Sequence, residues 1–149
     1  MSTVNQKIAV VGAGAVGCFF GGMLTRSNQE PILIGRAERV DAINRFGLRM
    51  DCQGFQADVA LQASADFTDI ADADIILLCV KSYDTLATMQ AMQPFLSAHT
   101  VIVSLQNGVS NVELITSIVA NPVYAAAVYV AVAMTDLNTV KHYEYYCTK

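Results

Sequence analysis

The feature that most constrains the fold is a short apolar segment followed directly by three closely spaced glycines. Residues 7–20 read KIAVVGAGAVGCFF, so the glycines form the pattern G-x-G-x-x-G directly after a predicted strand. In this context Gly12 permits a tight turn, Gly14 lets backbone N–H groups approach a diphosphate, and Gly17 lets the following helix pack closely on the strand. The segment predicts a dinucleotide site formed by Gly12, Ala13, Gly14, Ala15, Val16 and Gly17.

Predicted strands alternate with predicted helices along the chain. Strands are expected at residues 7–11, 32–35, 75–81 and 101–105, and helices at 15–27, 39–46, 84–96 and 111–119. Residues 48–63 alternate between apolar and polar side chains with a turn near Gly54, which favours a hairpin or an extended excursion. Two β-rich segments, 123–133 and 140–146, follow. This alternation predicts one α/β domain over residues 1–149, with a Rossmann-type, doubly wound and mostly parallel sheet.

The end of the second predicted strand bears on which dinucleotide would bind. The string ILIGRAERV places Gly35 and Arg36 there. An NAD site usually has an acidic residue at this point to bind the ribose hydroxyls, whereas arginine can pair with the 2′-phosphate of NADP. Arg36 and Arg39 therefore favour NADP(H) over NAD(H), although Glu38 between them weakens the contrast.

Lys81 and Asn107 occupy the corresponding ends of two later strands, in LLCVKSYDT and VIVSLQNGV. A lysine after a strand is commonly just solvated, and Asn-Gly is a common turn signal. Because the carboxyl ends of parallel strands meet at one edge of a sheet, both residues are nevertheless expected to face the glycine segment. There a lysine could anchor the cofactor or a substrate oxyanion, and an amide could hold ribose hydroxyls or a substrate oxygen.

Charge and composition argue against several other classes of protein. The net charge of −4 and the pI near 4.9 leave no basic surface for nucleic acid. The apolar run 123–134 is too short to span a bilayer as a helix, so no membrane segment is expected. The four cysteines have no paired spacing, which argues against a zinc site or a disulfide framework and favours a reducing cytoplasm.

The acidic and histidine residues predict no metal site. Four aspartates precede the strand at 75–81, namely Asp66, Asp69, Asp72 and Asp74. They are expected to form a solvated patch that starts a helix. His99 and His142 lack companions at ligand spacing and are expected at the surface.

In order along the chain, GAGAVG, the arginine that closes the second strand, CVKSYDT and SLQNGV resemble the N-terminal domain of the ketopantoate reductase (2-dehydropantoate 2-reductase) family. The similarity extends from about Lys7 to His142. Many dehydrogenases share the glycine motif, but its combination with VK and QNG is more specific. The resemblance implies reduction of a small keto acid, ketopantoate, to pantoate with NADPH, on the route to pantothenate and coenzyme A.

The resemblance also implies roles for individual residues. Residues 12–17 would hold the pyrophosphate and Arg36 the 2′-phosphate. Lys81 would lie beside cofactor and substrate, and Asn107 would contact the nicotinamide ribose and the substrate. The backbone around Val132 would skirt the nicotinamide.

Members of the family continue into a helical second domain, which supplies a general-acid lysine and a substrate-binding glutamate. Neither has a motif match here, so we expect that C-terminal domain to be absent from the chain, and the chain alone to bind cofactor without turnover. Apolar groups from 130 to 146 are expected to be exposed and to promote homo-oligomers. Two alternatives stay open: another NAD(P)-dependent hydroxyacid or sugar-phosphate dehydrogenase, and a non-catalytic nucleotide-sensing module.

Overall fold

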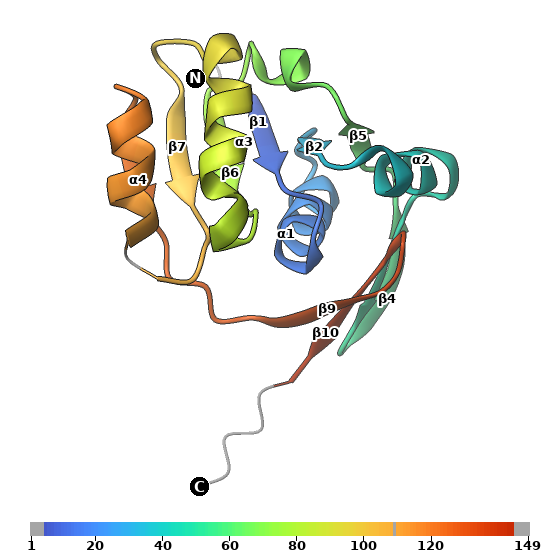
Figure 1. The fold of residues 1–149 in the computed structure, drawn as a ribbon. Helices are drawn as coiled ribbons and strands as arrows, with labels where there is room; N and C mark the ends of the chain where they lie inside the picture. Colours follow the sequence, from blue (N-terminus) through green and yellow to red (C-terminus); the bar gives the residue numbers. More distant parts are fainter. Residues whose placement is uncertain (1–4, 109, 145–149) are drawn as a thin grey trace, which may run out of the picture.

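A computed structural model describes residues 5–108 and 110–144, and its larger sheet has six parallel strands. They lie in the order β5 (Gln62–Ser64), β2 (Ile32–Ile34), β1 (Ile8–Val11), β6 (Ile75–Leu78), β7 (Val101–Ser104) and β8 (Val123–Ala125). The strand order reverses between β1 and β6, which puts the switch point of a doubly wound sheet at their carboxyl ends. Figure 1 shows the arrowheads of β1 and β7 pointing to this same edge.

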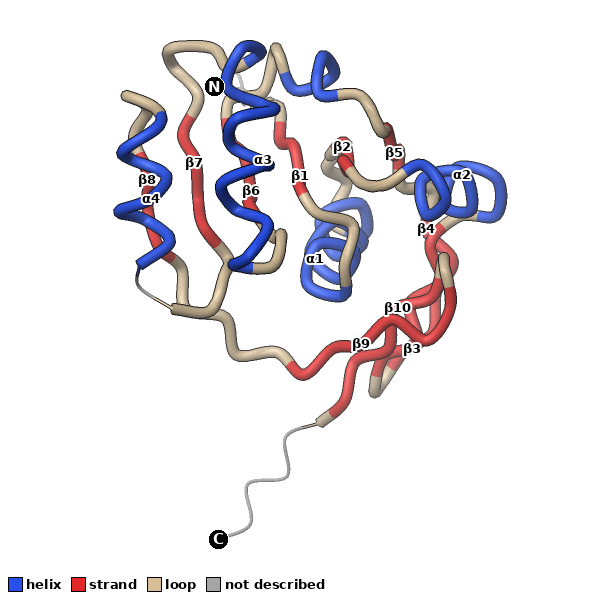
Figure 2. The backbone as a smooth tube through the Cα atoms, viewed as in Figure 1, coloured by secondary structure: helices blue, strands red, loops and turns tan. Residues whose placement is uncertain are grey.

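Helices cover both faces of this sheet. One apolar cluster includes α1 (Ala15–Arg26) and α2 (Ala37–Phe46), and the other includes α3 (Thr85–Met92) and α4 (Ser110–Ile118). Within β1, Val10 joins the first cluster, whereas Ala9 and Val11 join the second, because successive strand residues face opposite sides. The apolar run before the glycines is therefore buried on both faces. Figure 2 shows α3 and α4 side by side over the sheet.

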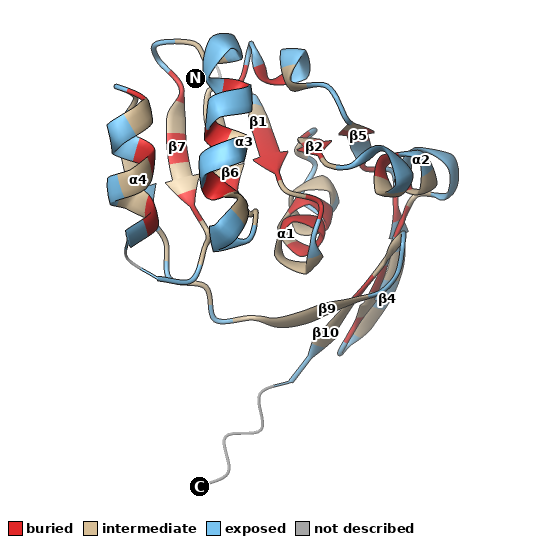
Figure 3. Ribbon diagram, in the orientation of Figure 1, coloured by how far each residue is buried: buried red, intermediate tan, exposed pale blue. Residues whose placement is uncertain are grey.

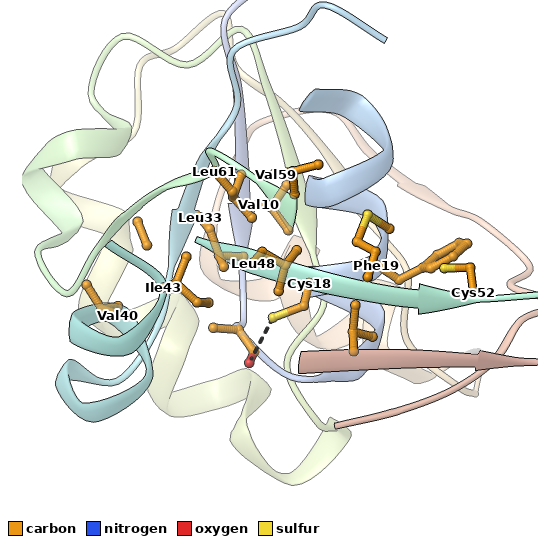
Figure 4. Close-up of a cluster of buried hydrophobic side chains, with 14 residues drawn as sticks. Val10, Cys18, Phe19, Leu33, Val40, Ile43, Leu48, Cys52, Val59 and Leu61 are labelled. Atoms are coloured by element: carbon orange, nitrogen blue, oxygen red, sulfur yellow. Dashed lines mark hydrogen bonds between the residues drawn. The ribbon is translucent and has the colours of Figure 1, made fainter. Parts of the chain in front are cut away.

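A second sheet, with four strands, packs on α1, so that α1 lies between the two sheets. Its order is β4 (Phe55–Val59), β3 (Leu48–Cys52), β10 (Thr139–Tyr143) and β9 (Ala131–Asp136). β3 and β4 form the antiparallel hairpin predicted around Gly54, and β10 pairs with β3 in parallel. Gly22 permits the close approach, since a Cβ there would lie 2.5 Å from Met50 Sδ. Leu48 of β3 and Phe19 of α1 meet in the cluster drawn in Figure 4.

The helices differ from prediction at their ends. α2 begins at Ala37, two residues earlier than predicted, because the extended backbone of Arg36 (φ −71°, ψ 146°) already forms its N-cap. The helix predicted to reach residue 96 ends as an α-helix at Met92. It continues as the 3-10 turn Gln93–Phe95, where Pro94 lacks the N–H that an α-helix needs. α4 begins at Ser110, one residue earlier than predicted.

Two strand predictions also need correction. The segment 123–133 is divided between β8 and β9, which belong to different sheets. β5 is missing from the prediction, because its sequence QAS has no apolar pattern. Tyr145 and Tyr146, in the predicted strand 140–146, lie outside the described residues. Within residues 5–108 and 110–144, no helix is both long and apolar enough to cross a bilayer.

No residue of the most apolar run of the chain is fully buried. Every residue from 123 to 134 is half-buried or exposed, and Tyr129 is 85% exposed. β8 and β9 are each the outermost strand of their sheet, and Figure 3 shows β9 coloured as only partly buried. The apolar side chains of residues 130–146 were predicted to be exposed, but Val140 is fully buried because it faces α1. Val130, Val132 and Met134 pack against the cluster around α1, whereas Tyr124 and Tyr129 leave an exposed apolar surface between β8 and β9.

Candidate functional site

The glycine segment forms the turn between β1 and α1, and the backbone itself requires two of its glycines. Gly12 has a φ of +112°, and a Cβ on it would lie 2.7 Å from the amide nitrogen of Val80, just beyond β6. A Cβ on Gly17 would lie 1.8 Å from the carbonyl oxygen of Gly12. The N–H of Gly12 donates to the carbonyl of Ile34 at 2.9 Å, which ties the turn to β2. A side chain at residue 12 or 17 would therefore displace the turn.

The fold does not require a glycine at residue 14. Nothing lies within 4 Å of a Cβ built on it, and its φ of −81° suits any residue. It is the N-cap of α1, where no side chain caps the helix and the first turn has no acidic residue. Unsatisfied N–H groups and the positive end of the helix dipole favour an anion at this position. The residues present therefore fit a bound diphosphate.

Arg36 lies next to this turn, at the N-cap of α2. A Cβ on Gly35 would lie 2.3 Å from the Cβ of Ala13, so a side chain at 35 would displace the glycine turn. The strand end thus presents Arg36, which is exposed and forms no ion pair with any described residue. Arg39 instead donates from Nη1 to the carbonyl of Leu137 at 3.3 Å, which ties α2 to the β9–β10 turn.

Lys81 and Asn107 lie on neighbouring loops at the same edge of the sheet. Lys81 follows β6 and is the N-cap of the 3-10 turn Ser82–Asp84, and Asn107 lies between β7 and α4. Both residues are exposed. The side-chain amide of Asn107 forms no hydrogen bond with any described residue, so both of its polar groups are available.

Backbone and side-chain contacts connect these two loops to the glycine turn. Val80 lies against Gly12, and its carbonyl accepts a hydrogen bond from Nε2 of Gln106 at 3.0 Å. The hydroxyl of Ser82 donates to the carbonyl of Asn107 at 3.1 Å. The structure therefore brings together the glycine turn and the loops of Lys81 and Asn107, as the sequence predicts.

Val132 is the predicted site residue that lies on the second sheet. It belongs to β9, faces His142 of β10 in the register, and packs half-buried against the apolar cluster around α1. Among the described residues, no hydrogen bond joins β9 to the loops of Lys81 and Asn107. The structure thus places Val132 in an edge strand without testing its predicted role.

Two free thiols, those of the buried Cys18 and the half-buried Cys79, lie beneath the glycine turn. The thiol of Cys18 donates to the carbonyl of Ala13 at 3.5 Å, shown as the dashed line in Figure 4. A Cβ on Gly17 would lie 3.4 Å from the Cβ of Cys79. Burial raises the pKa of Cys18 and of Cys79 to about 12. Both thiols are therefore neutral at pH 7 and place no negative charge under a bound anion.

The prediction that His142 lies at the surface is wrong. Its ring is half-buried, with its centroid 5.0 Å from that of Phe19 on α1. His142 shares a strand face with Val140, two residues earlier, and that face packs on α1. The error arose because β10 was not expected to pack on this helix.

The acidic residues have local structural partners. Asp66 accepts the N–H of Thr68 at 2.9 Å and so caps a 3-10 turn, as predicted for this patch. Asp74 accepts the N–H of Lys7 at 2.8 Å and lies 3.1 Å from Nε2 of His99. The hydrogen bond from Lys7, with a smaller contribution from His99, lowers the pKa of the Asp74 carboxyl. Across residues 5–108 and 110–144, no three His, Cys, Asp or Glu side chains are grouped as metal ligands.

Two surface cavities lie at the amino ends of the strands. One is beside Pro31, at the start of β2, and the other is beside Asp74 and His99, at the starts of β6 and β7. Neither is lined by a residue of the glycine turn. Both therefore lie at the opposite edge of the sheet from the candidate site.

A parallel sheet with a glycine turn at its switch point and an uncapped helix N-terminus defines a Rossmann-type domain, the class of fold that binds dinucleotides. The chain belongs to the ketopantoate reductase family, because the family profile described as "Ketopantoate reductase PanE/ApbA" matches residues 8–148. The resemblance seen in the sequence is thereby confirmed.

Similar proteins support this assignment. The 2-dehydropantoate 2-reductase of Pyrococcus abyssi is 35% identical over 107 residues, which cover 71% of this chain and 34% of that protein. The crystal structure of a PanE/ApbA family ketopantoate reductase from Ralstonia eutropha superposes with a TM-score of 0.91 at 45% identity, over 93% of this chain and 47% of that chain. A D-mandelate dehydrogenase in a ternary structure with NADH and anilino(oxo)acetate gives a TM-score of 0.84 at 29% identity, over 93% of this chain and 46% of that chain.

The chain therefore spans about a third of this curated relative and about half of the two solved structures. The matched part is the Rossmann-type domain.

Proposed function

We propose that this chain is the NADP(H)-binding part of an oxidoreductase that reduces 2-dehydropantoate to pantoate. The contrast among the three glycines carries the proposal. The fold needs Gly12 and Gly17, whereas Gly14 leaves open space at a helix N-terminus that no side chain caps. A turn of this kind binds a diphosphate through its backbone N–H groups.

Each candidate residue has a role in this proposal. Residues 12–17 bind the diphosphate. Arg36 pairs with the 2′-phosphate, which would also lie near the first N–H groups of α2. When bound, the cofactor supplies a hydride for the substrate carbonyl carbon. Lys81 and Asn107 bind the nicotinamide ribose and the substrate oxygen, and the backbone at Val132 skirts the nicotinamide.

The substrate assignment rests on the relatives. The curated relatives from Pyrococcus abyssi and Pyrococcus horikoshii are both named 2-dehydropantoate 2-reductase. A small keto acid also suits the pair of exposed polar side chains, Lys81 and Asn107, next to the predicted nicotinamide position.

Arg36→Ala is expected to weaken NADPH binding by about tenfold or more, because a charge-assisted contact to the 2′-phosphate is lost. NADH binding should change little, since NADH has no 2′-phosphate. Fluorescence titration of the purified chain with each nucleotide measures both affinities.

Arg45→Ala serves as the control for Arg36→Ala, because Arg45 lies in the last turn of the same helix, where its guanidinium is 5.2 Å from the ring of Phe46. It should leave both affinities unchanged. Equal losses of NADPH and NADH binding in Arg36→Ala would contradict a contact with the 2′-phosphate.

A second candidate is an NAD-dependent hydroxyacid dehydrogenase. The D-mandelate dehydrogenase structures that resemble this chain are complexes with NADH. Tighter binding of NADH than of NADPH by the wild-type chain would favour this alternative.

A non-catalytic nucleotide sensor would bind nucleotide but would not reduce any keto acid when assayed as the full-length protein.

The exposed apolar surface between β8 and β9 is expected to make the purified chain self-associate. Tyr129→Ser should shift the sedimentation profile toward monomer, because Tyr129 is the most exposed aromatic residue of that surface. Phe46→Ser, on α2 and 66% exposed, should leave the profile unchanged. A monomeric wild-type chain at high concentration would refute this prediction.

A further inference from the structure

Asn111 joins the two loops that carry Lys81 and Asn107. It is the second residue of α4 and is 4% exposed, although its side chain is polar. Its Nδ2 donates to the carbonyl of Asn107 at 2.9 Å and to the hydroxyl of Ser82 at 3.2 Å. Because Ser82 directly follows Lys81, one amide group contacts both loops. Figure 2 shows that α3 and α4 both start from this edge of the sheet.

The same amide is held on its other side by a series of buried and partly buried hydrogen bonds. Oδ1 of Asn111 accepts from the hydroxyl of Thr85 at 3.4 Å, and that hydroxyl accepts from Nε2 of Gln106 at 2.7 Å. Oε1 of Gln106 accepts from the hydroxyl of Ser104 at 2.9 Å. Thr85 and Ser104 are also buried, so the network extends from β7 through the start of α3 to α4. Each donor in this hydrogen-bond network has an acceptor, and this determines the orientation of the Asn111 amide.

The loops themselves have little other support. Lys81, Ser82 and Asn107 are all exposed, and no strand pairing extends to them. The two loops are held together by the hydrogen bonds of Ser82 and Asn111 to the carbonyl of Asn107, and by that of Gln106 to the carbonyl of Val80.

We infer that Asn111 is a positioning residue, which holds Lys81 and Asn107 in the one arrangement that can receive the nicotinamide half of the cofactor. The inference rests on the proposed dinucleotide function. Asn111 does not touch the cofactor in this proposal. Without it, the loops occupy that arrangement only part of the time, and the apparent affinity falls by the same fraction.

Asn111→Asp tests this inference, because it keeps the shape of the side chain but replaces the donor by an acceptor that repels the carbonyl of Asn107. Calorimetric titration of the chain with NADPH, and with adenosine 2′,5′-bisphosphate, separates the two ends of the site. We expect Asn111→Asp to weaken NADPH binding by roughly tenfold and to leave the bisphosphate affinity unchanged. Asn107→Ala should show the same pattern.

Asn121→Asp is the matched control. Nδ2 of Asn121 donates to the carbonyls of Ser97 and Thr100 at 2.8 and 2.9 Å, at the opposite edge of the sheet. This variant loses the same type of hydrogen bond, so it reports any general loss of stability. Its ratio of NADPH affinity to bisphosphate affinity should equal that of the wild type.

Ser82→Ala covers the case in which Asn111→Asp does not fold, because Ser82 is exposed and its hydroxyl bonds both to Asn107 and to Asn111. It should give the same pattern with a smaller loss, roughly threefold. An unchanged affinity ratio in the folded Asn111 or Ser82 variant, or an equal loss of both ligands, would overturn the positioning role. A wild-type chain that binds neither ligand would instead refute the proposed function, and the inference with it.

Discussion

Gly17→Ala is expected to lower the free energy of unfolding by more than about 3 kcal/mol. The reason is that its Cβ would lie 1.8 Å from the carbonyl oxygen of Gly12, so backbone must move. Gly14→Ala is expected to cost only about 1 kcal/mol, because alanine is a poorer N-cap than glycine but has open space here. In that variant NADPH binding should nevertheless fall by about a hundredfold or more, because the methyl group would occupy the proposed position of the diphosphate. Urea unfolding and NADPH titration measure the two effects.

Gly22→Ala is the matched control, since it makes the same substitution later in α1. Its Cβ would lie 2.5 Å from Met50 Sδ, the flexible part of a side chain that can rotate away. We expect a loss of about 1–3 kcal/mol in stability with NADPH affinity unchanged. Wild-type NADPH affinity in Gly14→Ala would contradict the proposed diphosphate position, and wild-type stability in Gly17→Ala would contradict the described turn.

The main sheet could be predicted because local patterns specify it. β1 and β6 are continuous apolar runs, IAVV and IILL, which is typical of strands buried on both faces. Gly47 ends α2 with a φ of +78°, at the C-cap position that the sequence predicts. The glycine turn follows β1 directly, so its place at the carboxyl edge followed from topology.

The second sheet could not be predicted in the same way. β10 pairs with β3 across most of the length of the chain, and no local pattern specifies such a pairing. The signal that the sequence did contain was Gly22, a glycine in a helix, which lets Met50 approach α1. Glycine in a helix has several explanations, and only the structure shows that this one is close packing.

The candidate site also contains residues that the sequence predicts and residues that only the structure reveals. The location of Lys81 and Asn107 at the carboxyl edge could be predicted, because the strand-end rule needs only the order of the strands. Thr85, Gln106 and Asn111 could not, because polar residues at loop and helix starts are typical of solvated surface. Tertiary packing buries Asn111 and Thr85, and their hydrogen bonds make that burial tolerable.

The 149-residue chain is expected to bind NADPH but not to reduce ketopantoate. The groups proposed to bind the phosphates, residues 12–17 and Arg36, belong to one compact region of the described structure. The chain covers only 47% of the Ralstonia eutropha structure, and the family resemblance implies that the general-acid lysine and the substrate-binding glutamate belong to the remaining part. Loss of general acid catalysis alone lowers rates by about 10²–10⁴-fold, and loss of substrate positioning adds to this.

Loss of nicotinamide absorbance with ketopantoate present measures turnover by this chain, and fluorescence titration of the same sample measures binding. The full-length relative from Pyrococcus abyssi, 35% identical to this chain over 107 residues, is the positive control for the assay. Turnover by the chain at a rate near that of the control would show that residues 1–149 contain the acid, and Lys81 would be the first residue to test, because its exposed ammonium lies at the proposed nicotinamide end. A folded chain that binds no NADPH would refute the cofactor proposal, since every phosphate contact that it invokes lies within these residues.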